Sequence, residues 1–87
     1  MIGSINIKDV KLKIGDWCKQ KRHLFQLSQD DLAQVLDMSR LTIRKLEEGK
    51  NVTVDSLLKV VNHFDMLENV YNAIDADVSN NNINSLY

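Results

Sequence analysis

Apolar residues recur along the first part of the chain at the spacing of an amphipathic helix. The positions that share this face are Val10, Ile14, Trp17, Cys18, Leu24 and Phe25. The pattern predicts a helix that begins at about residue 10 or 14 and ends near residue 24. Val10, Leu12 and Ile14 also alternate with lysines, which is the period of a half-buried strand, so residues 5–13 stay open between helix and strand. Gly15 adds to this ambiguity, because glycine weakens a helix interior by roughly 1 kcal/mol relative to alanine.

Residues that cap helix starts mark the next two helices. Ser28 precedes Asp31 by three positions, the arrangement of a capping box, and predicts a helix of about nine residues. Its buried face is expected to comprise Leu32, Ala33, Val35 and Leu36. After a turn of about three residues, Ser39 can cap a helix over about 39–48 that ends at Gly49. Ile43 and Leu46 are the inward positions of this helix.

The second half of the chain predicts two more helices and a polar end. Thr53 can cap a fourth helix, with inward positions at Val54, Leu57, Leu58, Val61 and Phe64. A fifth helix is indicated at i, i+3, i+4 and i+7 by Leu67, Val70, Tyr71 and Ile74. The last residues are polar and rich in Asn, which predicts a flexible tail. We therefore expect an all-α, five-helix domain over residues 1–76, with its core in 14–65, and a short flexible C-terminal tail over 77–87.

Composition agrees with one small helical unit. The chain has 87 residues, of which 44% are hydrophobic and 26% charged, and its three Gly and absence of Pro argue against an all-β sandwich. Domains of this size bury only about 60 to 65% of their surface, so stabilisation by a second subunit is expected. Cys18 is the single cysteine, which excludes an intrachain disulfide. Since the chain shows neither a signal-peptide pattern nor an apolar run that could cross a bilayer, we expect a cytoplasmic protein with no membrane partner.

Charge is divided unevenly between the two halves of the chain. The net charge is −1, yet residues 1–50 hold ten of the eleven Lys and Arg against seven acids, a balance of +3. Residues 51–87 hold Lys59 against five acids, a balance of −4. Because positive and negative charge are separated in this way, a basic face of the first half can approach a polyanion despite the net negative charge of the chain.

The helices predicted from Ser28 and Ser39 have the spacing that lets one helix lie on a DNA backbone while the next enters the major groove. With Ile43 and Leu46 facing the core, 100° per residue puts Leu41, Lys45 and Glu48 on the opposite face. Arg44 and Thr42 then lie on the flanks, and Arg40 lies at the projecting first turn. The helix predicted from Ser39 is therefore the one expected to contact the base edges of DNA.

At this point the sequence resembles the Xre or lambda-repressor-like helix-turn-helix family. Residues 21–50, KRHLFQLSQDDLAQVLDMSRLTIRKLEEGK, are similar to the family core without a gap, and residues 53–70 to its fourth helix and the start of its fifth. The motifs L-S-Q-x-x-L-A and T-I-x-x-L-E-x-G-K, at this spacing, carry the resemblance. It implies a five-helix, lambda-repressor-like domain that binds operator DNA as a dimer.

Several site residues follow from the resemblance. Gln29 corresponds to a phosphate-binding Gln of the family, while Arg40, Leu41 and Lys45 occupy positions that face base edges, with Arg44 beside them. Arg40 suggests a guanine in the half-site, and Leu41 suits only a thymine methyl, which leaves the operator sequence open. The remaining DNA-binding candidates are Ser39, Thr42, Lys50 and Asn51. The last three of these are placed to bind phosphates.

The resemblance also implies a structural ion pair and two unusual turns. Arg22 and Glu47 match a family pair that joins the first helix to the third. Gln26 and Asp37 stand where the family commonly has Gly. Asp tolerates the left-handed backbone conformation better than Gln, so the corner after the first helix is expected to differ.

Two functions from different classes remain after these observations. The first is a sequence-specific, double-stranded DNA-binding transcriptional regulator, expected to be a dimeric repressor whose interface comprises Leu67, Val70, Tyr71 and Ile74. The alternative is a HipB-type antitoxin that neutralises a toxin kinase and regulates its own operon, because the run from Asn51 to Val70 also resembles helices of those proteins. We expect no enzyme, because no nucleophile, catalytic base or glycine-rich loop accompanies the carboxylate pairs. No cofactor or metal site is expected, since Cys18, His23 and His63 lack the spacing of metal ligands.

Overall fold

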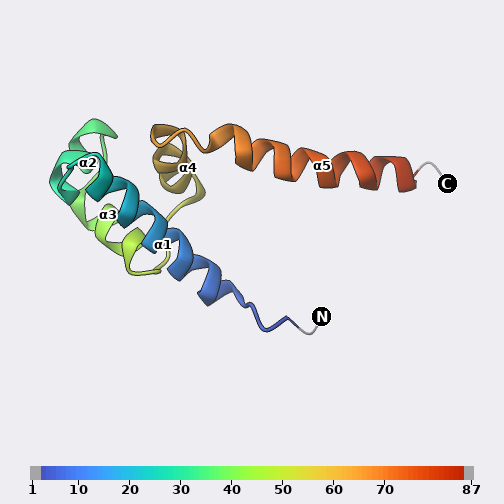
Figure 1. Ribbon diagram of the computed structural model, residues 1–87, viewed down its shortest axis with the longest axis horizontal. Helices are drawn as coiled ribbons and strands as arrows, with labels where there is room; N and C mark the ends of the chain where they lie inside the picture. Colours follow the sequence, from blue (N-terminus) through green and yellow to red (C-terminus); the bar gives the residue numbers. More distant parts are fainter. Residues whose placement is uncertain (1–2, 86–87) are drawn as a thin grey trace.

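A computed structural model describes residues 3–85, with side chains as far as residue 80. Over this range the chain forms five helices and no strand, which confirms the all-α prediction (Figure 1). The helices are α1 (Ile7–Leu24), α2 (Gln29–Val35), α3 (Arg40–Glu47), α4 (Val54–His63) and α5 (Leu67–Ser85).

The first helix begins earlier than the hydrophobic pattern predicts. Asn6 caps α1, because its side chain accepts a 2.8 Å hydrogen bond from the Asp9 N–H while the Asp9 carboxylate accepts one of 3.1 Å from the Asn6 N–H. This capping box favours helix over strand and settles residues 7–13 as helical. Val10, which the pattern placed on the apolar face, is 48% exposed, and Ile5 and Ile7 next to the cap are exposed as well.

The predicted caps of the next three helices are all present. The Ser28 hydroxyl accepts from the Asp31 N–H at 3.0 Å and the Asp31 carboxylate accepts from the Ser28 N–H at 2.9 Å, which lowers the pKa of Asp31. Ser39 caps α3 through the Thr42 N–H, and Thr53 caps α4 through the Ser56 N–H, each at 3.1 Å. Local sequence therefore determines where α2, α3 and α4 begin.

The core lies where α1 to α4 meet, and it differs from the predicted one at several positions. Its buried apolar residues are Cys18, Leu32, Ala33, Ile43, Leu46, Val60, Val61 and Phe64. Val60, which the sequence analysis missed, completes an i, i+3, i+4, i+7 face of α4 with Leu57, Val61 and Phe64. Val54 was wrongly placed inward: it lies in the first turn of α4 and is 71% exposed.

Other predicted core residues lie at helix ends and are also exposed. They are Leu24 and Phe25 at the end of α1 and Val35 at the end of α2. Phe25 nevertheless stacks on Phe64, with ring centroids 5.8 Å apart and planes 15° apart. A terminal turn projects beyond the neighbouring helices, so a residue with the correct period there lacks a partner to bury it.

Three of the described turns place a residue other than glycine in the left-handed conformation, and one of these residues is Asp65, after α4, with φ 61°. Gln26, after α1, has φ 58°, and Asp37, after α2, has φ 53°. The backbone N–H groups of the next residues close these turns, with Leu27 donating to the Arg22 carbonyl and Met38 to the Ala33 carbonyl, each at 2.9 Å. The corner after α1 therefore keeps the conformation that suits glycine and holds a strained Gln in it.

Gly15 permits the close approach of α1 to α3. A Cβ atom at this position would lie 2.5 Å from the backbone oxygen of Glu47 and 2.8 Å from that of Leu46. The residue that the sequence analysis treated as a weak point of α1 is therefore needed for tertiary packing. One turn earlier, the Leu12 side chain lies against Gly49, just beyond the end of α3.

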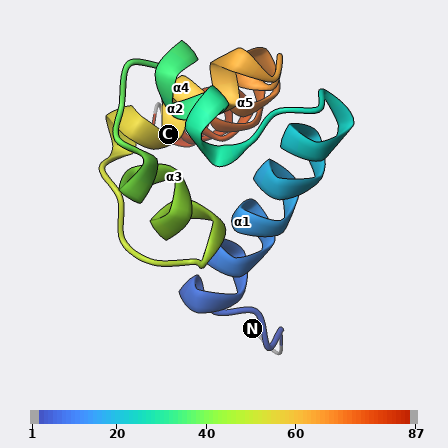
Figure 2. The same ribbon diagram turned by 90° about the vertical axis from the view of Figure 1, so that its left-hand side faces the viewer.

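The fifth helix extends away from the other four. It leaves the body beside α4 and accounts for the elongated outline, 51 Å by 27 Å by 22 Å (Figures 1 and 2). Its backbone stays helical through residues 77–85, and the side chains from 71 to 80 are exposed. The division between a domain of residues 1–76 and a tail of 77–87 stays a prediction, and residues 86 and 87 lie outside the described part.

Candidate nucleic-acid interface

α2 and α3 are joined by a short turn, residues 36–39, and pack against each other (Figure 2). Asp37 adopts the left-handed conformation, and its N–H donates to the Gln34 carbonyl at 3.2 Å. Leu32 and Ala33 of α2 are buried, as is Ile43 of α3, so both helices are held on the same core. The turn and the shared core set the angle at which α3 is presented.

α3 has one buried face and one exposed face, as its sequence predicts. Ile43 is fully buried and Leu46 is 6% exposed. On the opposite side Leu41 is 47% exposed and Lys45 is exposed, as is Arg44 on the flank. The helix therefore presents its cationic residues outward while its apolar residues anchor it to the core.

Among the exposed basic candidates, Arg40 and Lys50 each form a surface ion pair. Arg40 Nε lies 3.8 Å from Asp30 Oδ1, and Lys50 Nζ lies 3.1 Å from Glu48 Oε1. The side chains of Arg40 and Lys50 are each 65% exposed. Surface pairs of this kind contribute about 0 to 1 kcal/mol, so a polyanion can replace them. Thr42 shares a 2.9 Å hydrogen bond with Ser39, and Asn51 accepts one from Lys11.

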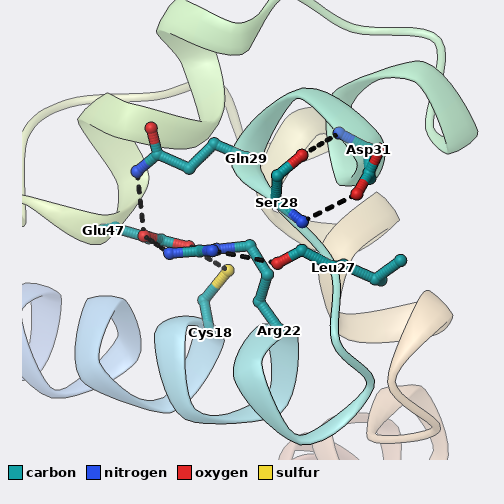
Figure 3. Close-up of polar contacts among 7 residues, drawn as sticks. All are labelled: Cys18, Arg22, Leu27, Ser28, Gln29, Asp31 and Glu47. Atoms are coloured by element: carbon teal, nitrogen blue, oxygen red, sulfur yellow. Dashed lines mark hydrogen bonds and ion pairs between the residues drawn. The ribbon is translucent and has the colours of Figure 1, made fainter.

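Gln29 is tied to the core side of the site. Its side-chain amide donates to Glu47 Oε1 at 3.0 Å, and the residue is partly buried at the first turn of α2 (Figure 3). A carboxamide carries two N–H donors, so one remains after this bond. The expected phosphate contact of Gln29 stays a prediction.

Arg22 and Glu47, which were expected to pair, form a bidentate ion pair between α1 and α3. Arg22 Nε donates to Oε2 at 2.8 Å and Nη2 donates to Oε1 at 3.0 Å, with side chains 10% and 1% exposed (Figure 3). Arg22 Nη1 also donates to the Leu27 carbonyl at 3.0 Å, which ties the turn after α1 to the same group. The pair thereby positions the start of α2 relative to the end of α3.

Burial and hydrogen bonding shift the pKa values of this cluster in opposite directions. Burial acts to raise the pKa of Glu47, but hydrogen bonds from Arg22 and Gln29 and the charge of Arg22 outweigh it, so the pKa is lowered. Its bond to Glu47 raises the pKa of Arg22. Burial, and then the Glu47 charge, raise the pKa of Cys18 to about 12. Cys18 is thus a neutral core thiol that donates to Glu47 Oε2 at 3.6 Å.

The described part of the chain contains neither a candidate metal site nor a candidate membrane-spanning helix. Within residues 3–85, no three His, Cys, Asp or Glu side chains are grouped so that they could hold a metal ion. None of the helices in this range is long and apolar enough to cross a membrane.

A pair of short helices joined by a tight turn, the second with an exposed cationic face, defines a helix-turn-helix domain. The family model described as helix-turn-helix matches residues 19–68, and the chain belongs to this family, as the resemblance implied. A protein of Methanoculleus marisnigri, whose name describes it as a predicted HTH-type transcriptional regulatory protein, is 39% identical to this chain over 64 residues. The match covers 74% of this chain and 18% of that protein, so the chain spans about a fifth of its relative's length.

The apolar face expected on α5 is present and exposed. Leu67 is 40% exposed, Tyr71 67% and Ile74 60%, while Val70 is half-buried against the body. Val70 also lines an apolar groove of about 420 Å³ between α1, α4 and α5, together with Trp17 and Leu58. α5 therefore carries apolar surface that the described residues of the chain leave uncovered.

Proposed function

We propose that this protein binds double-stranded DNA in a sequence-specific manner and regulates transcription in the cytoplasm, with α3 in the major groove. The observation that carries this proposal is the two-sided character of α3, which pairs a buried apolar face with exposed Arg40, Arg44 and Lys45. In helix-turn-helix proteins the first residues of the second helix reach the base edges. Family membership supports the same function.

The proposed base contacts come from the N-terminal part of α3. Arg40 can donate two hydrogen bonds to O6 and N7 of a guanine once it leaves Asp30, and each such pair discriminates by about 1 to 3 kcal/mol. Leu41 offers an exposed apolar surface for a thymine methyl. Lys45, one turn further on, lies on the same outward face, with Arg44 at its edge.

The proposed backbone contacts surround these residues. Gln29 at the start of α2 and Ser39 and Thr42 at the start of α3 would bind phosphates through N–H or hydroxyl groups. Lys50 and Asn51 follow the end of α3 and would bind the backbone there. Such contacts fix the register of the domain on the duplex without reading its sequence.

Dimerisation through α5 is the second part of the proposal. The exposed face formed by Leu67, Tyr71 and Ile74 supports it, because contiguous apolar surface of this kind marks a partner. A symmetric dimer would bind two half-sites about one helical turn apart and repress by blocking the transcription machinery. Sedimentation of the full chain at tens of micromolar tests this part. Ile74→Asp is expected to make the protein monomeric, whereas Asn72→Asp, which lies off the apolar face, should leave it dimeric. A wild-type chain that stays monomeric even with duplex bound would contradict dimerisation.

The antitoxin function remains the second candidate because α5 is both acidic and apolar. Its exposed apolar face lies beside Glu68 and Asp75, a combination that suits another protein as well as a second copy. A toxin gene adjoining this reading frame would favour this candidate, whereas an isolated gene would favour a plain repressor.

Selection of bound duplexes from a random pool by the full chain tests the DNA-binding proposal directly. The expected result is a conserved sequence with two related halves, at least one containing a guanine. Recovery of no preferred sequence would contradict sequence-specific binding. No retention of any duplex at low salt would contradict DNA binding itself.

A further inference from the structure

The N-terminal half of α1 precedes the segment that matches the family and lies beside the loop that follows α3. The family match begins at residue 19, whereas α1 begins at Ile7. Gly15 brings α1 against the last turn of α3, and Leu12 lies against Gly49. These two contacts hold the start of α1 next to Lys50 and Asn51.

Lys11 joins these two residues in the same place. Its Nζ donates to Asn51 Oδ1 across a sequence distance of 40 residues. Lys11, Lys50 and Asn51 line one groove of about 180 Å³ between α1 and the loop, whose apolar wall includes Leu46 and Val52. An apolar wall of this kind can pack against lysine stems while their ammonium groups reach solvent, and the Lys50 side chain is 65% exposed.

The chemistry of this groove suits an oxyanion. Because Asn51 uses its oxygen to accept from Lys11, its N–H₂ group is what it offers to a ligand. The groove lining therefore contributes two lysine ammonium groups and one amide N–H₂ as hydrogen-bond donors. The nearby acid is Glu48, which is paired with Lys50 on an exposed surface where the contact is weak.

We propose that Lys11, Lys50 and Asn51 together bind one phosphate of the DNA backbone, so that α1 takes part in the protein–DNA interface. The inference rests on the proposed DNA binding, and it adds a contact from outside the helix-turn-helix segment. Asn51 positions the Lys11 ammonium in addition to its own contact. A phosphate bound here fixes the end of α3 on the duplex while Arg40 reads bases at its start.

The test compares two lysines of α1 that carry the same charge. Lys11→Gln removes the proposed contact, whereas Lys13→Gln removes a lysine that lines the apolar groove on another side of the helix with Trp17. Fluorescence anisotropy of the full chain with a random-sequence duplex, between about 50 and 200 mM KCl, measures affinity and its salt dependence. We expect Lys11→Gln to weaken binding to the random duplex and to make the slope of log K against log salt less steep, by at most the ~0.9 of one phosphate because Lys50 still contacts it. Lys13→Gln should leave both quantities near the wild-type values.

Three outcomes separate this inference from the proposed function. An unchanged slope and affinity for Lys11→Gln, or an equal loss for Lys13→Gln, overturns the phosphate site while DNA binding by α3 stands. A loss by Lys11→Gln that is equal in proportion on selected and random duplexes supports it, because phosphate contacts are independent of sequence. If the wild-type chain retains no duplex, the proposed function itself fails. Thermal unfolding by circular dichroism checks that each variant remains folded.

Discussion

Gln29 and Glu47 share a 3.0 Å hydrogen bond that joins the first turn of α2 to the last turn of α3. Glu47 also accepts two hydrogen bonds from Arg22 of α1, so a single carboxylate connects three helices (Figure 3). The carboxylate is 1% exposed, yet Gln29 begins the helix that we propose to lie on the DNA backbone. The buried cluster thereby sets the geometry of the proposed interface.

Replacing Arg22 by Met is expected to lower the free energy of unfolding by about 3 to 5 kcal/mol, because it strands the Glu47 charge in the core. Urea denaturation measures the loss, and Lys19→Met, an exposed change on the same helix, should have little effect. The double variant Arg22→Met with Glu47→Leu should recover much of the loss, since no buried charge remains unpaired. An unchanged urea midpoint for Arg22→Met would contradict a stabilising pair.

Stability is expected to fall in acid because the pKa of Glu47 is lowered in the folded protein. A carboxyl with a lowered folded pKa stabilises the fold above its unfolded value of about 4.5, and this contribution is lost as the pH falls from there through the folded pKa. Glu47→Gln should therefore be less stable at neutral pH and show a flatter decline between about pH 5 and 2. The free energy of unfolding across this range is the measurement, and Glu48→Gln controls for net charge. An equally steep decline in Glu47→Gln would assign the effect to other carboxyls, such as Asp31, whose pKa is also lowered.

Gly15→Ala is expected to destabilise the protein, although the same change stabilises most helix interiors by about 1 kcal/mol. The added Cβ would meet the Glu47 backbone oxygen at 2.5 Å, and overpacking of this kind costs about 1 to 3 kcal/mol. Thermal unfolding measures the change, with Asp16→Ala as an exposed control on the same helix. A higher melting temperature for Gly15→Ala would mean that α1 and α3 are not in such close contact.

Gln26→Gly is expected to stabilise the protein by up to about 1 kcal/mol. Glycine removes a left-handed strain of about 1 to 2 kcal/mol at φ 58°, and part of this gain is lost because glycine makes the unfolded chain more flexible. Gln34→Gly, an exposed position inside α2, should instead cost about 1 kcal/mol. Urea midpoints distinguish the two signs, and a loss at both positions would show that the turn is not strained.

Arg40→Ala and Lys50→Ala are expected to affect DNA binding in different ways. Loss of Arg40 should relax the preference at one base position, because it removes a base-edge contact, whereas loss of Lys50 should weaken all sequences alike. Lys50→Ala should also make the salt slope less steep by about one unit. Binding titrations with a selected and a random duplex separate these effects. An equal loss on both duplexes from Arg40→Ala would remove Arg40 from the base contacts.

Sequence reasoning worked where a feature depends on neighbours along the chain. The caps at Ser28, Ser39 and Thr53 and the two faces of α3 follow from residues within one or two turns. It failed where burial depends on what lies opposite, as for the exposed Val54 and the buried Val60. It also assigned Gly15 a cost within α1, because the backbone of α3 that it accommodates is distant in sequence.

The sequence by itself determined the helical class, three of the helix starts and the resemblance that family membership confirmed, because capping and periodicity are local properties of the chain. Only the tertiary structure decided that Glu47 holds Arg22 and Gln29 together, that Lys11 meets Asn51, and that α5 projects with its apolar face uncovered. These relations join residues on different helices. Their distances depend on how the helices pack, which the spacing of residues along one helix does not specify.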